Sequence, residues 1–156
     1  AIGGFVGGNV APAVSRRLGS GPSLALALGG GAVLPAVIAL VPEWPVVLVL
    51  FGINSVLGMI WNVITVSLRQ TIIPAHLLGR VNSVYRFFAW GMMPIGAALG
   101  GLIVFVVERF ADRDLALRAT WLAAAIVHVG LFVFGRARLT TDKIEAARAA
   151  VTMTAS

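Results

Sequence analysis

Residues 69–101 read RQTIIPAHLLGRVNSVYRFFAWGMMPIGAALGG, and this stretch decides how the chain folds. It places a short basic segment, with Pro74, Gly79, Arg80 and Arg86, between two apolar runs. Each run is long enough to cross a bilayer, whose hydrocarbon core requires about 20 apolar residues in a helix. The second run also carries small residues four positions apart. The stretch therefore predicts two membrane helices joined by a tight basic loop.

The composition of the whole chain also favours a membrane protein. The chain has 156 residues, of which 59% are apolar and 12% are charged, and its mean hydropathy is +0.97. An average soluble domain has about a quarter of its residues charged. The charges of this chain fall between long uncharged runs, which is the distribution that a membrane imposes. We therefore do not expect a water-soluble globular domain.

The formal net charge of +6 first suggests a nucleic-acid partner. The basic residues, however, lie in short loops beside apolar spans, where they determine the topology of a membrane protein. We therefore expect no nucleic-acid binding. The sequence contains no cysteine, which excludes disulfides, iron–sulfur clusters and cysteine-based zinc sites. We predict no metal site and no cofactor.

The apolar runs predict an all-α fold, a polytopic bundle of transmembrane helices. Because the chain begins with Ala1 and its first residues look like the end of an apolar helix, we expect a fragment whose N-terminal portion is missing. Gly3 and Gly7 in this first run, and also Gly4 and Gly8, are spaced so that another helix can approach closely. The expected spans are 1–14, 23–41, 46–68, 81–107 and 115–134, followed by a polar tail, 137–156.

Local signals predict how several spans begin, end and pack. Ser15–Gly21 has the glycines of a loop, and Asp114 is the expected N-cap of the last span. The triplet Gly29–Gly31 indicates close packing or a bend within the second span, because a membrane helix must keep its backbone hydrogen bonds. Asp142 and Glu145 have the spacing of a helix start. We expect a weak amphipathic helix there, in a tail that is mobile or lies at the membrane surface.

The span 46–68 is the most polar one. Asn54, Asn62 and Thr65 recur at helical spacing and so share one face. A polar stripe in a membrane helix should face protein or water, because lipid cannot satisfy it. These residues are candidates for contact with a transported molecule. Hydrogen bonds to other helices are the alternative.

Aromatic and titratable residues give further candidates. Trp61 and Trp90 are candidates for stacking on an aromatic substrate, whereas Trp44 is typical of an interface anchor. His128, well inside the last span, is either a proton relay or a residue packed on a neighbouring helix, and we favour packing. No Asp or Glu lies inside a complete span.

The loops alternate between the two sides of the membrane, and the basic residues divide unequally between these sides. One side carries three basic residues, Arg109, Arg113 and Arg118, together with four acidic ones. The other side carries nine. These nine are Arg16, Arg17, Arg69, Arg80, Arg86, Arg136, Arg138, Lys143 and Arg148. An excess of basic residues in short loops marks the cytoplasmic side, so we expect a multi-pass protein of the plasma (inner) membrane with a cytoplasmic C-terminus.

Five arginines on this side are candidates for contacts that open or close a cytoplasmic gate. The alternative is that they are topology charges in solvated loops, and the sequence does not choose between the two. The five are Arg16, Arg17, Arg69, Arg80 and Arg86.

Several short motifs follow one another in order: NVIT at 62–65, LRQ at 68–70, PAHLLGRVNS at 74–83 with Arg86, and GMMPIGA at 91–97. In this order they resemble the C-terminal half of major facilitator superfamily transporters. They are most similar to the bacterial efflux branch that includes macrolide and siderophore exporters. The resemblance covers most of the chain up to about Arg136.

The resemblance implies that residues 1–136 form the C-terminal half-bundle, from a partial helix 8 to helix 12 of twelve. It implies that the spans 46–68 and 81–107 line the central cavity. Ser15–Gly21 would correspond to the second copy of the superfamily's motif A, although Pro12 stands where an acidic residue is common. Small residues at Gly96, Gly100 and Gly101 form a ridge for helix packing.

An enzyme is not predicted, because an intramembrane enzyme needs a nucleophile with a base or a metal constellation. The best interpretation is a fragment of a secondary active transporter that exports small organic molecules by alternating access. A structural membrane subunit without a substrate is the alternative. The expected partners are the lipid bilayer, the missing N-terminal half of the same chain, a small-molecule substrate and a coupling ion, for which H+ is favoured.

Overall fold

The computed structural model describes residues 2–136 and 138–154, which are almost entirely helical. Four of the helices in these ranges are long and apolar enough to cross a membrane, namely α2 to α5. This confirms the all-α class, and the chain has the helices of a membrane protein. The helices are α1 (Ile2–Leu18), α2 (Ser20–Leu40), α3 (Trp44–Ile72), α4 (Ala75–Val107), α5 (Arg113–Arg136) and α6 (Thr141–Thr154).

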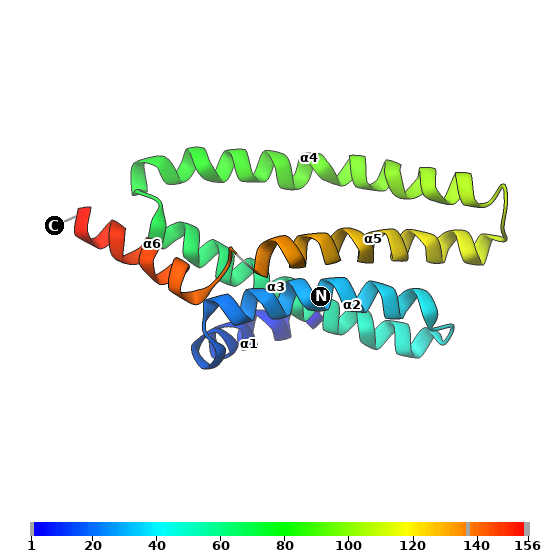
Figure 1. Cartoon of the computed structure of the whole chain (residues 1–156), viewed down its shortest axis with the longest axis horizontal. Helices are drawn as coiled ribbons and strands as arrows, with labels where there is room; N and C mark the ends of the chain where they lie inside the picture. The colour runs from blue at the N-terminus through cyan, green and yellow to red at the C-terminus, as the bar shows by residue number, and fades with distance from the viewer. Residues whose placement is uncertain (1, 137, 155–156) are drawn as a thin grey trace.

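The four long helices run back and forth along one axis (Figure 1). The α1–α2 and α3–α4 junctions lie with α6 at one end of the bundle, which we call the basic end. The α2–α3 and α4–α5 loops lie at the opposite end. The arginines of the two junctions are therefore gathered at one end, as the alternation of loops predicts.

The helices are longer than the expected spans, and the α1–α2 loop is much shorter. The predicted loop Ser15–Gly21 is helical except at Gly19, which alone separates α1 from α2. Gly19 has φ = 84°, a left-handed conformation that glycine adopts without the steric penalty of a side chain. A helix can therefore end and the next begin within one residue.

The core of the bundle is formed by α2, which packs on α5, α3 and α1. Its most buried cluster lies near the basic end and joins Ala11, Leu24, Ile60 and Ile64 with Ile144 of α6. Ile144 is 8% exposed. The start of the expected tail is thus attached to the bundle rather than mobile, because Ile144 completes an apolar cluster.

Glycines in α1 and α2 allow the closest helix contacts. Gly3 and Gly7 face α3, where a side chain at Gly7 would overlap Met59, which confirms the close approach predicted from their spacing. In α2, Gly30 faces Leu57 of α3 and Gly31 faces His128 of α5. The glycine triplet is a packing point within a continuous helix.

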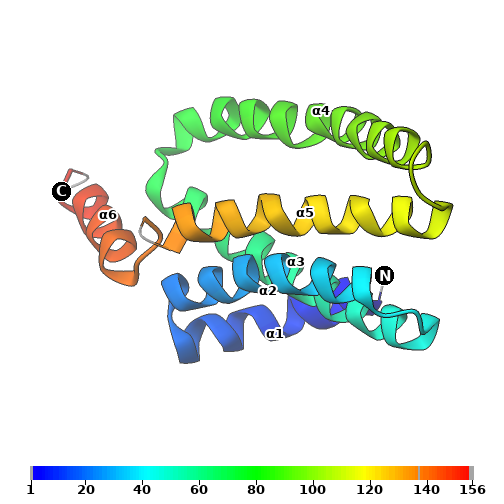
Figure 2. The same ribbon diagram turned by 45° about the vertical axis from the view of Figure 1, so that its right-hand side comes forward.

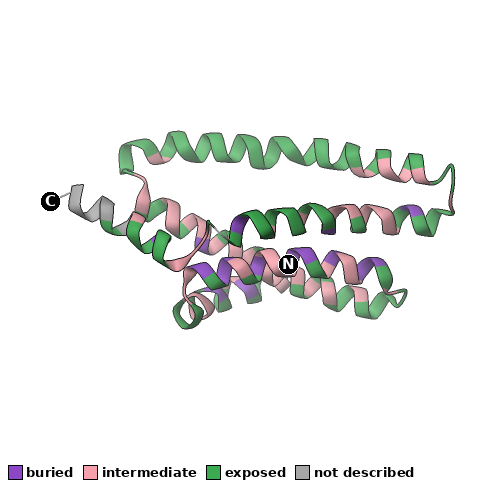
Figure 3. Ribbon diagram, in the orientation of Figure 1, coloured by how far each residue is buried: buried purple, intermediate pink, exposed green. Residues whose placement is uncertain are grey.

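The helix α4 lies at the edge of the bundle. It packs along α5 and meets α3 only near their junction, and both views place α5 between α4 and α2 (Figures 1 and 2). No described residue of α4 is buried, so the helix is green along most of its length in Figure 3. Its apolar side chains therefore face the surroundings of the chain, which for a membrane helix means lipid or another membrane protein.

The start of α5 corrects one prediction about capping. The backbone N–H of Leu115 donates a hydrogen bond to Oδ1 of Asp112 over 2.8 Å. Asp112, and not Asp114, therefore caps the helix. Asp114 lies inside the first turn and pairs with Arg118, whose Nε lies 2.7 Å from its Oδ2.

Candidate functional site

A cavity of about 340 Å³ lies between α2, α3 and α5, among the apolar membrane helices. This volume is within the range of about 300–1,000 Å³ that is typical of small-molecule sites. Most of its wall is apolar, and three side chains with polar or aromatic character converge on it. The lining residues are Ala27, Leu28, Gly31, Asn54, Leu57, Gly58, Trp61, His128 and Leu131.

Two of the predicted cavity residues, Asn54 and Trp61, lie in this wall. They are seven residues apart on α3, which places them on the same face two turns from each other. Gly58 lies between them and leaves room for the cavity. Asn54 is half-buried, and its amide makes no hydrogen bond to another described residue. It can therefore both donate to and accept from a bound molecule.

His128 reaches the cavity from α5. Its Nδ1 lies 2.9 Å from the carbonyl oxygen of Ala124, and because a carbonyl only accepts, Nδ1 is the donor. In the neutral ring Nε2 is then an acceptor. The ring lies against Gly31, where a Cβ would be 2.7 Å from Cδ2 and 3.3 Å from Nε2. His128 is thus packed on a neighbouring helix, as we expected, and it also lines the cavity.

The chemistry of the cavity suits a small neutral molecule. Its wall offers an amide at Asn54, an imidazole acceptor at His128 and an aromatic surface at Trp61, and it includes no Asp, Glu, Lys or Arg. A ligand with a permanent charge would meet no opposite charge here and would lose its hydration. A flat, largely apolar molecule with one or two hydrogen-bonding groups fits this lining best.

The other predicted cavity residues lie outside this wall. Asn62 is exposed. The hydroxyl of Thr65 lies 2.8 Å from the carbonyl oxygen of Trp61, within its own helix. Trp90 is 65% exposed on α4. A role for these three residues in a larger cavity stays a prediction.

No family model, no curated protein and no solved structure matches the chain. The resemblance to exporters therefore rests on the sequence motifs alone.

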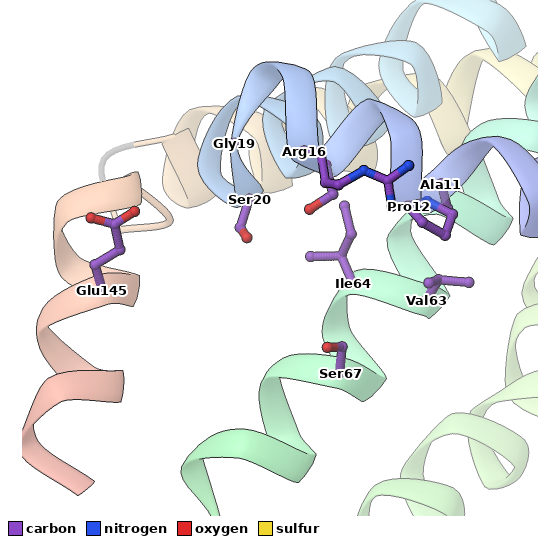
Figure 4. A pocket seen from close by; sticks show the side chains of 10 residues that line it. Ala11, Pro12, Arg16, Gly19, Ser20, Val63, Ile64, Ser67 and Glu145 are labelled. Atoms are coloured by element: carbon purple, nitrogen blue, oxygen red, sulfur yellow. The ribbon is translucent and has the colours of Figure 1, made fainter. Parts of the chain in front are cut away.

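A second cavity, of about 530 Å³, lies at the basic end between α1, α2, α3 and α6. Figure 4 shows Arg16 on one side of it and Glu145 of α6 on the other. Ser15, Ser20 and Ser67 also belong to its lining. Arg16, a predicted gate residue, thus borders a polar pocket that the C-terminal helix helps to form.

The remaining predicted gate arginines do not gather in this pocket. Arg17 is exposed, and so are Arg80 and Arg86 near the start of α4. Arg69 is half-buried, and its guanidinium carbon lies 3.7 Å from the centre of the Tyr85 ring. One arginine therefore connects α3 to α4, while the others face outward.

The predicted packing ridge on α4 has a partner at one position. A Cβ added at Gly100 would lie 3.5 Å from Cγ2 of Thr120 on α5. A Cβ added at Gly96 or Gly101 would have no atom of another element of the described chain within 4 Å. Contact of Gly96 and Gly101 with a further helix stays a prediction.

Among the residues of these pockets that were not predicted site residues, Gly31 and Glu145 matter most for their shape and charge. Gly31 was read only as part of a packing triplet, although its missing side chain makes space for His128. Glu145 was read only as a helix-start signal. The sequence holds a hint for each, since a glycine triplet in one span faces a lone histidine in another, but only the tertiary packing pairs them. No group of three metal-binding side chains occurs within residues 2–136 and 138–154.

Proposed function

We propose that the chain is part of a secondary active transporter, in which the cavity between α2, α3 and α5 contributes to the substrate-binding site. The observation that supports this proposal is the convergence of Asn54, Trp61 and His128 on a cavity inside apolar helices. Polar groups in membrane helices are costly and usually mark a substrate or ion pathway. The motifs between residues 62 and 101 resemble, in their order, efflux proteins of the major facilitator superfamily. This resemblance is the reason for proposing a transporter that exports its substrate.

In this proposal the bundle is the C-terminal half of the transporter, and the other half of the protein faces α3 and α4. The exposed surface of α4 supports a further membrane partner on that side. The basic end lies in the cytoplasm of the cell because of the positive-inside bias, and transport proceeds by rocking of the two halves about the site. An ion gradient, of H+ in the simplest case, drives export.

The substrate class follows from the lining of the cavity. A small, uncharged, amphipathic organic molecule would place its aromatic part against Trp61 and its polar group between Asn54 and His128. Nile red, a neutral aromatic dye whose fluorescence increases in lipid, has these properties and serves as a probe.

Export of Nile red by cells that produce the complete transporter tests the proposal. We expect Asn54→Leu, which replaces the amide by an apolar group with the same number of heavy atoms, to slow dye export several-fold with equal abundance in the membrane. The matched control is Asn9→Leu on α1, because Asn9 is an exposed asparagine whose amide bonds only to its own helix, over 2.8 Å to the carbonyl oxygen of Phe5. Equal export by the Asn54→Leu variant and the unaltered protein would contradict the proposed site.

A structural membrane subunit without a substrate is the second candidate. It is favoured by the tight glycine contacts of α1 with α3 and by the exposed face of α4, which would serve an assembly equally well. The two candidates differ in one respect. A scaffold does not need an unpaired amide beside a cavity. In a scaffold, Asn54→Leu should therefore leave the stability unchanged or increase it, and it should have no effect on the export of any molecule.

A further inference from the structure

Arg69 has an unusual environment near the end of α3. Its guanidinium group stacks over the ring of Tyr85 at 3.7 Å, and this contact connects the last turns of α3 with the third turn of α4. The face of an aromatic ring attracts a cation. The ring offers no oxygen to the N–H groups, however, so the stacking leaves the hydrogen-bonding capacity of the arginine unused.

Two of the three guanidinium nitrogens are buried without an acceptor. Neither Nε nor Nη1 of Arg69 is accessible or hydrogen-bonded to any described residue. A buried charged donor without a partner is more costly than a neutral one. The third nitrogen, Nη2, is not among the buried atoms. A molecule outside the chain that compensates this charge would therefore reach it at Nη2.

The neighbouring sequence supplies no anion. Residues 69–107 contain no Asp or Glu, and they add the basic side chains of Arg80 and Arg86, both of which are exposed. The end of α3 and the whole of α4 are thus positive, and neither acidic residue of α6, Asp142 or Glu145, forms an ion pair with Arg69. A negatively charged group that binds here must come from outside α3 and α4.

The position of Arg69 along α3 indicates where this anion lies. Trp44, at the other end of α3, is 76% exposed and typical of an interface anchor. The two residues are 25 positions apart, which corresponds to about 38 Å at 1.5 Å per residue and is longer than the hydrocarbon core of about 30 Å. With Trp44 at one interface, Arg69 lies at the level of the lipid headgroups of the opposite leaflet. The exposed rings of Phe87 and Phe88 on α4 then lie at the depth of the lipid chains of this leaflet.

We propose that the junction of α3 and α4 is a binding site for the phosphate group of an anionic phospholipid. Arg69 provides the principal contact through Nη2, and Tyr85 holds the guanidinium plane in place. Arg80 and Arg86 add the positive field that favours an anionic over a zwitterionic headgroup. A phosphate is well suited to this role because its oxygens accept charge-assisted hydrogen bonds from arginine. The site does not depend on the proposed transport activity.

Native mass spectrometry of the purified chain with added lipid tests this site. We expect the unaltered chain to retain phosphatidylglycerol in preference to phosphatidylcholine. Arg69→Gln should lower retention of phosphatidylglycerol about fivefold, the contribution of one basic side chain near an anionic surface. The matched control is Arg109→Gln, because Arg109 also stacks on a ring, 4.6 Å from the centre of Phe105, at the opposite end of the bundle. This control should retain the lipid as the unaltered chain does.

A second variant separates loss of binding from loss of folding. Tyr85→Ala changes a residue on the exposed helix α4, and helicity measured by circular dichroism should stay unchanged while lipid retention falls. Full retention by Arg69→Gln or by folded Tyr85→Ala would overturn the proposal. Equal retention of the two lipids by the unaltered chain would also overturn it. Complete displacement of phosphatidylglycerol by millimolar inorganic phosphate would reassign the site to a free anion and overturn the lipid assignment.

Discussion

Nη1 of Arg118 donates a hydrogen bond to the carbonyl oxygen of Ala39 over 3.2 Å and so connects the start of α5 to the end of α2. The last carbonyl groups of a helix have no partner within the helix, and a cation is favourable near them because of the helix dipole. Asp114 holds the other edge of the guanidinium group. A residue that the sequence places near the start of the last span, and counts only among the charges of one side, therefore fixes two membrane helices to each other.

Arg118→Leu should lower the free energy of unfolding by about 1–2 kcal/mol, because it removes a charge-assisted hydrogen bond from a partly exposed site. Unfolding of the purified chain by denaturant, followed by tryptophan fluorescence, measures the change. Arg113→Leu is the control, since its pair with Glu108 is long, at 3.7 Å, and its side chain is exposed. Equal losses in the two variants would argue against the helix-end contact.

Gly31→Ala should destabilise the bundle by about 1–3 kcal/mol, as expected for overpacking of a close contact. The new Cβ would lie 2.7 Å from Cδ2 of His128. Gly29→Ala is the matched control, because its Cβ would meet Phe132 at an ordinary 3.5 Å and alanine is the better helix former. In combination with His128→Ala the penalty of Gly31→Ala should largely disappear, and a double-mutant cycle in thermal unfolding measures this coupling. Additive effects of the two substitutions would contradict the packing described here.

Ile144→Ala should release α6 from the bundle. Ile144 is buried in the cluster with Leu24 and Ile64, and the loss of such a side chain costs about 2–5 kcal/mol where it is well packed. We expect faster hydrogen exchange in α6 and unchanged exchange in α2 to α5. Ala146→Ser, at an exposed position of the same helix, should leave exchange as it is. Protection of α6 that survives the loss of Ile144 would show that other contacts hold the helix.

Asp112→Ala should lower stability by about 1 kcal/mol, the usual effect of losing an N-cap. Its Oδ1 accepts the N–H of Leu115, so this substitution leaves a helix-end donor without a partner. Thermal unfolding compares this variant with Asp112→Asn, which keeps a capping oxygen and should be nearly neutral. A similar loss for the asparagine variant would attribute the effect to charge rather than to capping.

Much of the fold is predictable from the sequence because the membrane leaves few choices. Long uncharged runs can only be helices in lipid, so the spans follow from hydropathy. The end of the bundle at which each loop lies then follows from counting the spans. A close helix contact on α1 follows from the spacing of its glycines, although the spacing does not tell that Gly3 and Gly7 make it or that α3 is the partner. These predictions depend on residues that are close in sequence.

The features that could not be predicted from the sequence depend on contacts between two structural elements. Asp112 and Asp114 are both good capping residues, and the choice between them depends on where the last turn of α4 ends. Docking of α6 requires the backbone of Leu139 and Thr141 to pass through the space that a side chain at Gly21 would fill. The cavity itself depends on Gly31 and His128, which are 97 positions apart in the sequence. No local sequence pattern around Gly31 or around His128 predicts that these two residues are in contact.

The single residue between α1 and α2 has a mechanical consequence. One residue offers two backbone torsions, and at Gly19 these are held in a region that other residues rarely occupy. Because one residue spans only about 3–4 Å, a displacement of the end of α1 must carry the start of α2 with it at the basic end. The loop at 108–112, with several residues between α4 and α5, can absorb such a displacement. Inserted residues should accordingly be tolerated in that loop, whereas residues inserted at Gly19 should let the ends of α1 and α2 move apart.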